Sequence, residues 1–216
     1  MQNDNWFSTR PCRFSAIVVK DPATGEPRIS SAGFVLASQD LITILENQQS
    51  PVFYPIRSRF SNDIEQIVRN YTTYPADQVS TLEGLLEHEK AVGCKVNHES
   101  DQCTHATWKL VMLVRGYVFL LDVFHVLMEN PNAALTETFQ TCYKRTLGKY
   151  HMEYEKKIFH AVMYACPNRQ SFFTRLAGRS GNIDSMYPAA KAYFAELKTV
   201  VMILCPKLKQ QGFEIA

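Results

Sequence analysis

The chain has 216 residues, of which 46% are hydrophobic and 20% are charged. These values are ordinary for a globular protein, and a chain of this length can bury about 70% of its unfolded surface, so general disorder is excluded. Lysine and arginine number 23 against 21 acidic residues, and the net charge of +2 gives no strong field for nucleic acid. We expect one main folded unit with no nucleic-acid partner.

The cellular setting follows from cysteine usage and apolar patterning. The six cysteines include no CxxC pair, which fits a reducing compartment. Residues 1–13 are polar and contain Pro11, unlike a secretory signal. The longest apolar stretch, residues 110–128, is interrupted by Arg115, Asp122 and His125, which a membrane span would rarely tolerate. We therefore expect a soluble, cytoplasmic protein.

Helical periodicity dominates the chain from Ser31 onward, because apolar residues recur at spacings of three, four and seven. The expected helices cover residues 31–48, 57–72, 78–92, 104–129, 134–166 with a possible break near Gly148, 169–177 and 186–211. The segment from Phe14 to Val19 is compatible with either a strand or a helix.

The expected helix from Thr104 to Glu129 is apolar on nearly every side, which indicates burial between neighbouring helices. A buried central helix needs a covering layer. We therefore expect helices packed in two layers around a large apolar interior, which could open into a ligand cavity.

Ordered motifs along the chain are similar to those of a known family. They are Ser50-Pro-Val-Phe-Tyr-Pro-Ile56, Thr73-Tyr-Pro-Ala76, Thr81-Leu-Glu-Gly-Leu-Leu-Glu-His-Glu-Lys90, Arg115-Gly116 with Phe119, and Tyr150-His151 with Lys157-Ile-Phe159, Tyr164-Ala-Cys-Pro167 and Phe172. In this order they resemble the glycolipid transfer proteins, all-helical carriers of sphingolipids between membranes. The resemblance covers about residues 30 to 205. It implies an all-α fold, a two-layer helical sandwich enclosing an apolar lipid pocket, over residues 31–216, with residues 1–30 as an unmatched N-terminal extension.

The resemblance implies intracellular binding of a two-chain lipid, a sphingolipid or glycolipid, and its transfer between membranes. Exposing lipid chains to water costs about 0.8 kcal/mol per CH2, so a dry cavity lowers the barrier to transfer without ATP. The sequence contains no Walker, GxGxxG or GxSxG motif, and we expect neither an enzyme nor a cofactor. A transient membrane surface is the expected second partner, with Trp6 and Tyr154 as candidate contacts because Glu153 replaces the family's interfacial tryptophan.

The headgroup residues of the family are matched only in part. In the family, an Asp and a His hold the ceramide amide, an Asn and a Lys bind the first sugar, and a Trp stacks on it. Those positions hold Arg59, His151, Asp63, Gln66 and Met112, so four of five depart from the glycolipid pattern.

Arg59, Asp63 and Gln66 still share one helical face, because they are spaced by four and three residues. Asp63 could accept from the ceramide amide while Arg59 and Gln66 donate to headgroup oxygens. The alternative is an ordinary surface ion pair between Arg59 and Asp63. His151, expected in the middle of a helix, could donate to a lipid carbonyl, and the alternative is a core histidine.

A second stripe, formed by Trp108, Met112, Arg115 and Phe119, is spaced by four, three and four residues. Trp108 could replace the missing stacking ring, although such stripes are usually core. Arg115 needs a partner, either within the protein or in a headgroup, because an unpaired buried charge is costly. The ceramide-1-phosphate branch of the family has basic residues where this chain has Trp108, Met112 and Asp63, which disfavours a phosphate site.

Two other classes of function remain open at this stage. The departures allow a degenerate interaction or lipid-sensing module of the same fold that no longer transfers glycolipid. Four potential zinc ligands, Cys94, His98, Cys103 and His105, lie close together, but their spacing matches no common module, and a polar loop is the alternative. No spacing of Ser, His and Asp or of Cys and His singles out a nucleophile for a hydrolase.

Overall fold

The computed structural model describes residues 5–93 and 104–215, which form eight α-helices and a short hairpin. The helices are α1 (Ser31–Glu46), α2 (Tyr54–Thr73), α3 (Leu82–Ala91), α4 (Ala106–Glu129), α5 (Leu135–Arg145), α6 (Glu153–Tyr164), α7 (Arg169–Leu176) and α8 (Ile183–Gln210). The hairpin pairs β1 (Val18–Lys20) with β2 (Pro27–Ile29) in antiparallel register. The predicted all-helical class is confirmed.

Polar caps fix where several helices begin. The side chains of Ser30, Thr81, Asn168 and Asn182 accept hydrogen bonds from first-turn backbone N–H groups of α1, α3, α7 and α8. These caps explain why α3 begins four residues later than the periodicity predicts and α8 three residues earlier. Helix α2 starts at Tyr54 because Pro55, which has no N–H to leave unsatisfied, stands in its first turn.

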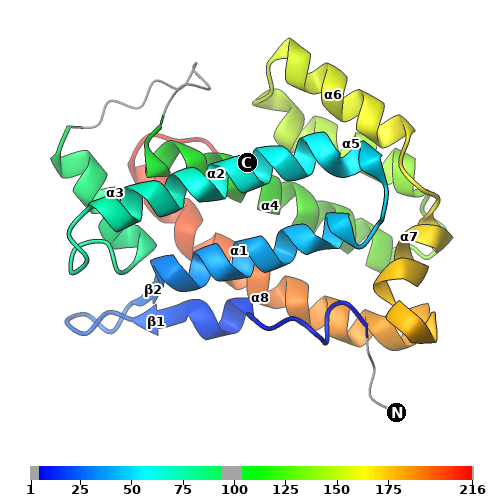
Figure 1. Ribbon diagram of the computed structural model, residues 1–216, viewed down its shortest axis with the longest axis horizontal. Coiled ribbons are helices and arrows are strands. Elements are labelled where there is room, and N and C mark those ends of the chain that lie inside the picture. The colour runs from blue at the N-terminus through cyan, green and yellow to red at the C-terminus, as the bar shows by residue number, and fades with distance from the viewer. Residues whose placement is uncertain (1–4, 94–103, 216) are drawn as a thin grey trace.

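Helix α4 is the centre of the molecule and packs against α2, α8, α5 and α3. Figure 1 shows α1 and α2 crossing in front of α4, with α8 below it and α5 and α6 at the upper right. By length and composition α4 could cross a membrane, but 67% of its most apolar window is buried inside the protein. It is therefore the core helix of the predicted two-layer arrangement.

Glu89 joins the end of α3 to the start of α4. Its buried carboxylate accepts hydrogen bonds from the backbone N–H groups of Ala106 and Thr107, both at 2.8 Å, and from the Thr107 hydroxyl at 2.6 Å. A carboxylate is favoured at a helix N-terminus because the first N–H groups lack partners within the helix and carry partial positive charge. This contact sets the position of the first turn of α4.

The N-terminal segment is part of the core. Trp6 is 5% exposed and its ring meets Phe7 and Tyr193 edge-on at 5.0 and 5.4 Å between centroids. The expectation that Trp6 contacts membranes is wrong, because its ring is buried against Phe7 and against Tyr193 of α8. The division of the chain at residue 30 remains a prediction from the family resemblance.

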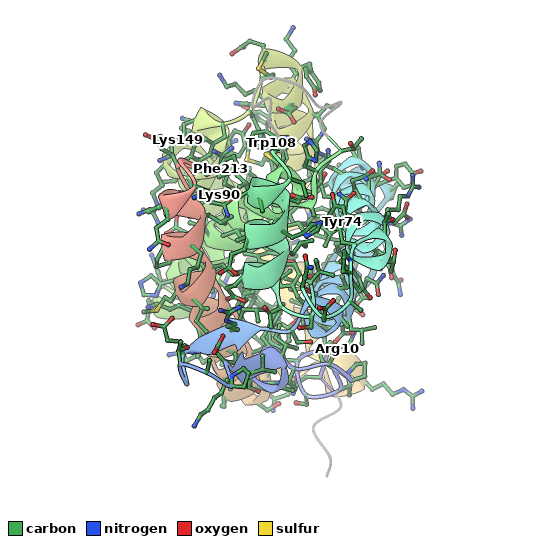
Figure 2. All side chains as sticks on the ribbon, turned by 90° about the vertical axis from the view of Figure 1, so that its left-hand side faces the viewer. Arg10, Tyr74, Lys90, Trp108, Lys149 and Phe213 are labelled. Atoms are coloured by element: carbon green, nitrogen blue, oxygen red, sulfur yellow. The ribbon has the colours of Figure 1, made fainter. Side chains whose placement is uncertain are left out.

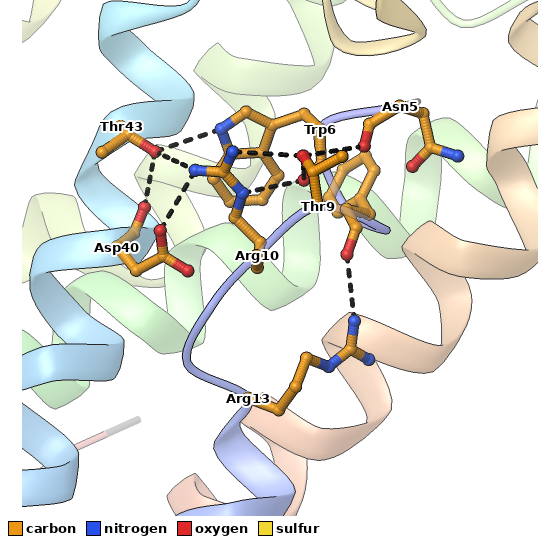
Figure 3. Close-up of polar contacts among 8 residues, drawn as sticks. Asn5, Trp6, Thr9, Arg10, Arg13, Asp40 and Thr43 are labelled. Atoms are coloured by element: carbon orange, nitrogen blue, oxygen red, sulfur yellow. Dashed lines mark hydrogen bonds and ion pairs between the residues drawn. The ribbon is translucent and has the colours of Figure 1, made fainter. Parts of the chain in front are cut away.

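Hydrogen bonds and an ion pair from Trp6 and Arg10 hold the N-terminal segment against α1. The Arg10 guanidinium donates to Asp40 Oδ1 at 3.0 Å and to Thr43 Oγ1 at 2.8 Å, and Trp6 Nε1 donates to Thr43 Oγ1 at 3.1 Å (Figure 3). Arg13 reaches α8 through Glu196, at 2.6 Å. The segment is thus tied to α1 and α8 by charged groups and packed against α4 and α8 by aromatic ones.

The possible break near Gly148 in the expected helix over residues 134–166 is confirmed, because α5 ends at Arg145, a 3-10 turn follows at Leu147–Lys149, and α6 starts at Glu153. The prediction that His151 lies in the middle of a helix is wrong, since His151 stands in the connection between α5 and α6. The open segment at Phe14 adopts both alternatives in turn, a 3-10 helix over Phe14–Ile17 followed by β1.

Candidate functional site

Helices α2, α4 and α6 enclose a cavity of about 110 Å³ with charged residues in its wall. Its lining consists of Pro55, Ile56, Arg59, Phe60, Asp63, Met112, Leu113, Gly116, Leu147, His151, Tyr154, Glu155, Ile158 and Phe159. The cavity lies beside the break between α5 and α6, which brings His151 to its edge. Four predicted headgroup residues, Arg59, Asp63, Met112 and His151, are therefore brought together at one site.

A second cavity of about 60 Å³ adjoins the first and has a wholly apolar lining. It is lined by Leu41, Ile42, Ile44, Leu45, Phe53, Ile56, Phe60, Phe119, Leu120, Phe139, Leu147, Phe159, Val162 and Met163. Ile56, Phe60, Leu147 and Phe159 line both cavities and form the wall between them. A largely apolar cavity with charged residues at its edge and a wholly apolar cavity thus share one boundary.

Asp63 is the most deeply buried charge of the first cavity, with a side chain 5% exposed. Its Oδ2 lies 3.5 Å from Arg59 Nε, and its Oδ1 lies 3.5 Å from Lys109 Nζ on α4. Arg59 also approaches Glu155 of α6, with 3.7 Å between Nη2 and Oε1. Burial of charge is tolerated here because each charged group faces one of opposite sign.

These contacts form an alternating series, Lys109, Asp63, Arg59 and Glu155, which we call the charge row. It runs from α4 across α2 to α6. The predicted ion pair between Arg59 and Asp63 exists. It differs from an exposed surface pair because the Asp63 side chain is buried. Lys109 and Glu155 were not predicted as site residues. The signal for Lys109 was available, since it is a cation in an otherwise apolar helical stretch, three residues before Met112.

His151 is held by aromatic neighbours. Its Nδ1 lies 2.9 Å from the Tyr143 hydroxyl, and its ring centroid is 4.8 Å from that of Phe159. Burial raises the pKa of Tyr143, so the hydroxyl keeps its proton and can donate to Nδ1. In that tautomer Nε2 carries the imidazole N–H. In this arrangement His151 can donate from Nε2 at the edge of the cavity.

The structure does not bring Arg115 or Trp108 to the lining of either cavity. The Arg115 guanidinium donates from Nε and Nη2 to the Glu214 carbonyl oxygen at 3.0 and 2.7 Å, and it lies 3.6 Å from the Tyr150 ring centroid. Burial lowers the pKa of Arg115. The partner required for this cation is therefore inside the protein, on the C-terminal segment.

Trp108 packs beside the same segment, with its ring centroid 6.3 Å from that of Phe213; both are labelled near the top of Figure 2. Gln66 is half-buried on α2 and also lies outside the lining of the cavities. Arg115, Trp108 and Gln66 each share a helix with residues that line the first cavity, but their own side chains line neither cavity. Their assignment to the headgroup site remains a prediction.

The expected zinc candidates can be assessed only in part. Cys94, His98 and Cys103 lie outside the described residues, and His105 stands just before the first turn of α4. Within residues 5–93 and 104–215, no three His, Cys, Asp or Glu side chains are grouped so as to hold a metal ion.

Comparison with known proteins decides the family. The sequence model described as Glycolipid transfer protein (GLTP) matches residues 29–178, well over half of the chain. The chain belongs to the glycolipid transfer protein family. A glycolipid transfer protein of Aureobasidium melanogenum is 27% identical to it over 177 residues, covering 82% of each chain.

Solved structures of other lipid transfer proteins show the same fold. The crystal structure of HET-C2, a fungal glycolipid transfer protein, superposes with a TM-score of 0.79 at 25% identity, over 94% of this chain and 96% of that one. Human ceramide-1-phosphate transfer protein in complex with 12:0 ceramide-1-phosphate superposes with a TM-score of 0.84 at 12% identity, over 98% of this chain and 99% of that one. The family resemblance and the sandwich fold predicted from the sequence are confirmed.

Proposed function

We propose that this member of the glycolipid transfer protein family takes up one two-chain lipid, a sphingolipid or glycolipid, and transfers it between membranes without ATP. The observation that carries the proposal is the pair of adjoining cavities, one edged by charged residues and one wholly apolar. A lipid has the same two parts, a polar head and apolar chains, in one molecule. Names of relatives that denote transfer of glycolipid and of ceramide-1-phosphate support the same class of cargo.

The first cavity has, at its edge, the polar groups that an amide lipid requires. Asp63 offers a carboxylate to an amide N–H or a hydroxyl, and His151 offers an imidazole to a carbonyl. The chains would enter between α1, α2 and α6, where the second cavity has its apolar walls. Burial there removes about 25 cal/mol of unfavourable hydration per Å² of apolar surface, which is the driving force for extraction.

A membrane-facing mouth is supported by exposed apolar side chains around the first cavity. Tyr54, Met152, Tyr154 and Ile158 are 61%, 60%, 51% and 40% exposed. Tyr154 and Ile158 also line the cavity. Tyrosine suits the boundary between lipid and water because its ring is apolar and its hydroxyl is polar. We propose that this surface makes the transient contact through which lipid enters.

The cytoplasm is the proposed location. Cys12, Cys142, Cys166 and Cys205 are free thiols in the described structure, as a reducing compartment favours. Transfer by a cavity needs no covalent step, so the protein is proposed to act as a carrier and not as an enzyme.

The test is capture and transfer of fluorescent sphingolipids between donor and acceptor vesicles, with native mass spectrometry of the protein after exposure to the donors. Val162→Phe replaces a small aliphatic side chain of the apolar cavity with a bulky aromatic ring. Tyr164→Phe, two residues further along α6 at a 73% exposed position, is the matched control. We expect Val162→Phe to lose capture and Tyr164→Phe to keep it. Absence of bound lipid across the panel for the wild type would favour the interaction module instead.

A further inference from the structure

The charge row balances positive and negative charge at the edge of the first cavity. This balance is not evident from any one of the departures from the family pattern. The members of the row alternate in sign, and the successive nitrogen to oxygen distances are 3.5, 3.5 and 3.7 Å. Arg59, Asp63 and Glu155 line the cavity, and Lys109 backs Asp63 from α4. Among the described residues, the two cations and two carboxylates of the row sum to zero charge, and each positive group faces a negative one.

Binding of an anionic headgroup beside this row would be electrostatically unfavourable. A phosphate monoester carries a charge of about −1.5 to −2 at neutral pH. Wherever it reached Arg59, it would also approach the carboxylates of Asp63 and Glu155, which lie within 4 Å of the same guanidinium. Binding would therefore require the ion pairs to separate or would place like charges close together in a partly desolvated cavity.

An uncharged headgroup meets the same row without either cost. A carboxylate has about four acceptor positions, so Asp63 can accept from an amide N–H or a hydroxyl while facing its cations. Arginine and lysine donate several hydrogen bonds each and can add a carbonyl or hydroxyl oxygen as an acceptor. The charges of the row stay balanced when such a ligand binds.

On the basis of the proposed function, we propose that the charge row selects an uncharged amide lipid of the ceramide type and rejects lipids with an anionic headgroup. Glu155 is the specificity-determining residue of this selection. It supplies the second carboxylate, and it comes from α6, on the far side of the cavity from Lys109. Without it the row would carry a net charge of +1.

The experiment uses ceramide and ceramide-1-phosphate with identical chains, because the two probes differ only by the phosphate. Each is offered in phosphatidylcholine vesicles, and bound lipid is counted by native mass spectrometry and by transfer. We expect wild-type protein to capture ceramide at least about tenfold better than ceramide-1-phosphate, a difference of about 1.4 kcal/mol in binding free energy.

Glu155→Gln removes the charge but keeps a side-chain oxygen that can accept from the Met152 N–H, as Glu155 does at 2.8 Å. We expect this variant to raise the ratio of ceramide-1-phosphate capture to ceramide capture about tenfold. Glu153→Gln is the matched control, since it makes the same change of net charge two residues away on α6. The Glu153 side chain is 82% exposed and pairs with Lys156, outside the cavity.

Three results would overturn the selection while leaving the proposed function standing. The first is wild-type capture of ceramide-1-phosphate equal to or above that of ceramide, which requires no variant to fold. The second is an equal shift of the capture ratio in Glu155→Gln and Glu153→Gln, which would assign the effect to overall charge. The third is an unchanged ratio in folded Glu155→Gln. Capture of neither probe nor of any other two-chain lipid would overturn the proposed function with it, whereas capture with the opposite preference overturns the selection alone.

Discussion

Gly116 of α4 lies directly against the ring of Phe60 on α2. A Cβ built on Gly116 would stand 2.9 Å from Phe60 Cε1 and closer still to Cζ. Phe60 lines both cavities, and its ring also stacks at 6.4 Å on that of Tyr117. The close approach of these two helices therefore depends on the missing side chain, and it sets the position of the wall between the cavities.

Gly116→Ala is expected to displace Phe60, lower the free energy of unfolding by about 1–3 kcal/mol and reduce lipid capture. Urea unfolding measures the first effect and vesicle transfer the second. In Phe60→Leu the smaller side chain leaves room for the added methyl, so the double variant should be more stable than the sum of the two single effects predicts. Strict additivity would show that the added methyl does not meet the ring.

His151→Ala should weaken lipid capture more than folding. One hydrogen bond to a ligand contributes about 0.5–1.5 kcal/mol, which corresponds to a loss of roughly two- to tenfold in affinity. Tyr143→Phe, which removes the hydroxyl that orients the imidazole, is expected to give a smaller loss in the same direction. His160→Ala, at an exposed position on α6, should leave capture unchanged. If the loss of capture were fully accounted for by a lower melting temperature of the variant, His151 would be a core residue and not a ligand-binding one.

Replacement of Asp63 by leucine should destabilise the fold by about 3–5 kcal/mol, because it leaves the buried Lys109 ammonium without the carboxylate that faces it. The additional change Lys109→Met should recover most of this loss. Equilibrium unfolding of the two single variants and the double variant provides the coupling energy. A coupling energy near zero would contradict the buried pair.

Galactosylceramide is expected to be a poor ligand of the wild type, since no ring stands at position 112. Met112→Trp should raise its capture about fivefold, because stacking on a ring contributes about 1 kcal/mol. Met112→Leu is the apolar control and should change nothing. The comparison is made by transfer of galactosylceramide between vesicles. A gain in both variants would point to packing and not to stacking.

Trp6→Ala is expected to lower the free energy of unfolding by about 3–5 kcal/mol, the usual effect of deleting a buried aromatic ring. Trp6→Phe keeps a ring but loses the donor to Thr43, so it should cost only about 1 kcal/mol beyond its change of shape. Thermal unfolding followed by circular dichroism distinguishes the two. Wild-type stability in Trp6→Ala would show that the N-terminal segment does not hold the core together.

The helices could be predicted from the sequence because their apolar residues recur locally. The ends of α1 and α4 fall within two residues of the predicted limits, and the burial of α4 follows from its uniform apolar surface. The break near Gly148 was also predicted, but its extent, which places His151 outside both helices, was not. It depends on the tight turn after α5, where a Cβ on Gly148 would lie 2.9 Å from the Tyr143 carbonyl oxygen, a contact that periodicity does not encode.

Only contacts between residues of the same helix could be predicted for the site. The ion pair of Arg59 and Asp63 follows from a spacing of four residues on α2. The partners that complete the charge row come from α4 and α6, and no spacing along one helix indicates which side chains of another will face it. Arg115 shows the same limit, since its partner is a backbone carbonyl 99 residues away in the sequence.

The contact between Glu89 and the first turn of α4 has a consequence for engineering. That carboxylate holds the first turn of α4 from a side chain on α3, and Lys109, which faces Asp63, stands in the same turn. Engineered changes of α3 that displace Glu89 should therefore disturb the charged edge of the first cavity, although Glu89 itself lines neither cavity.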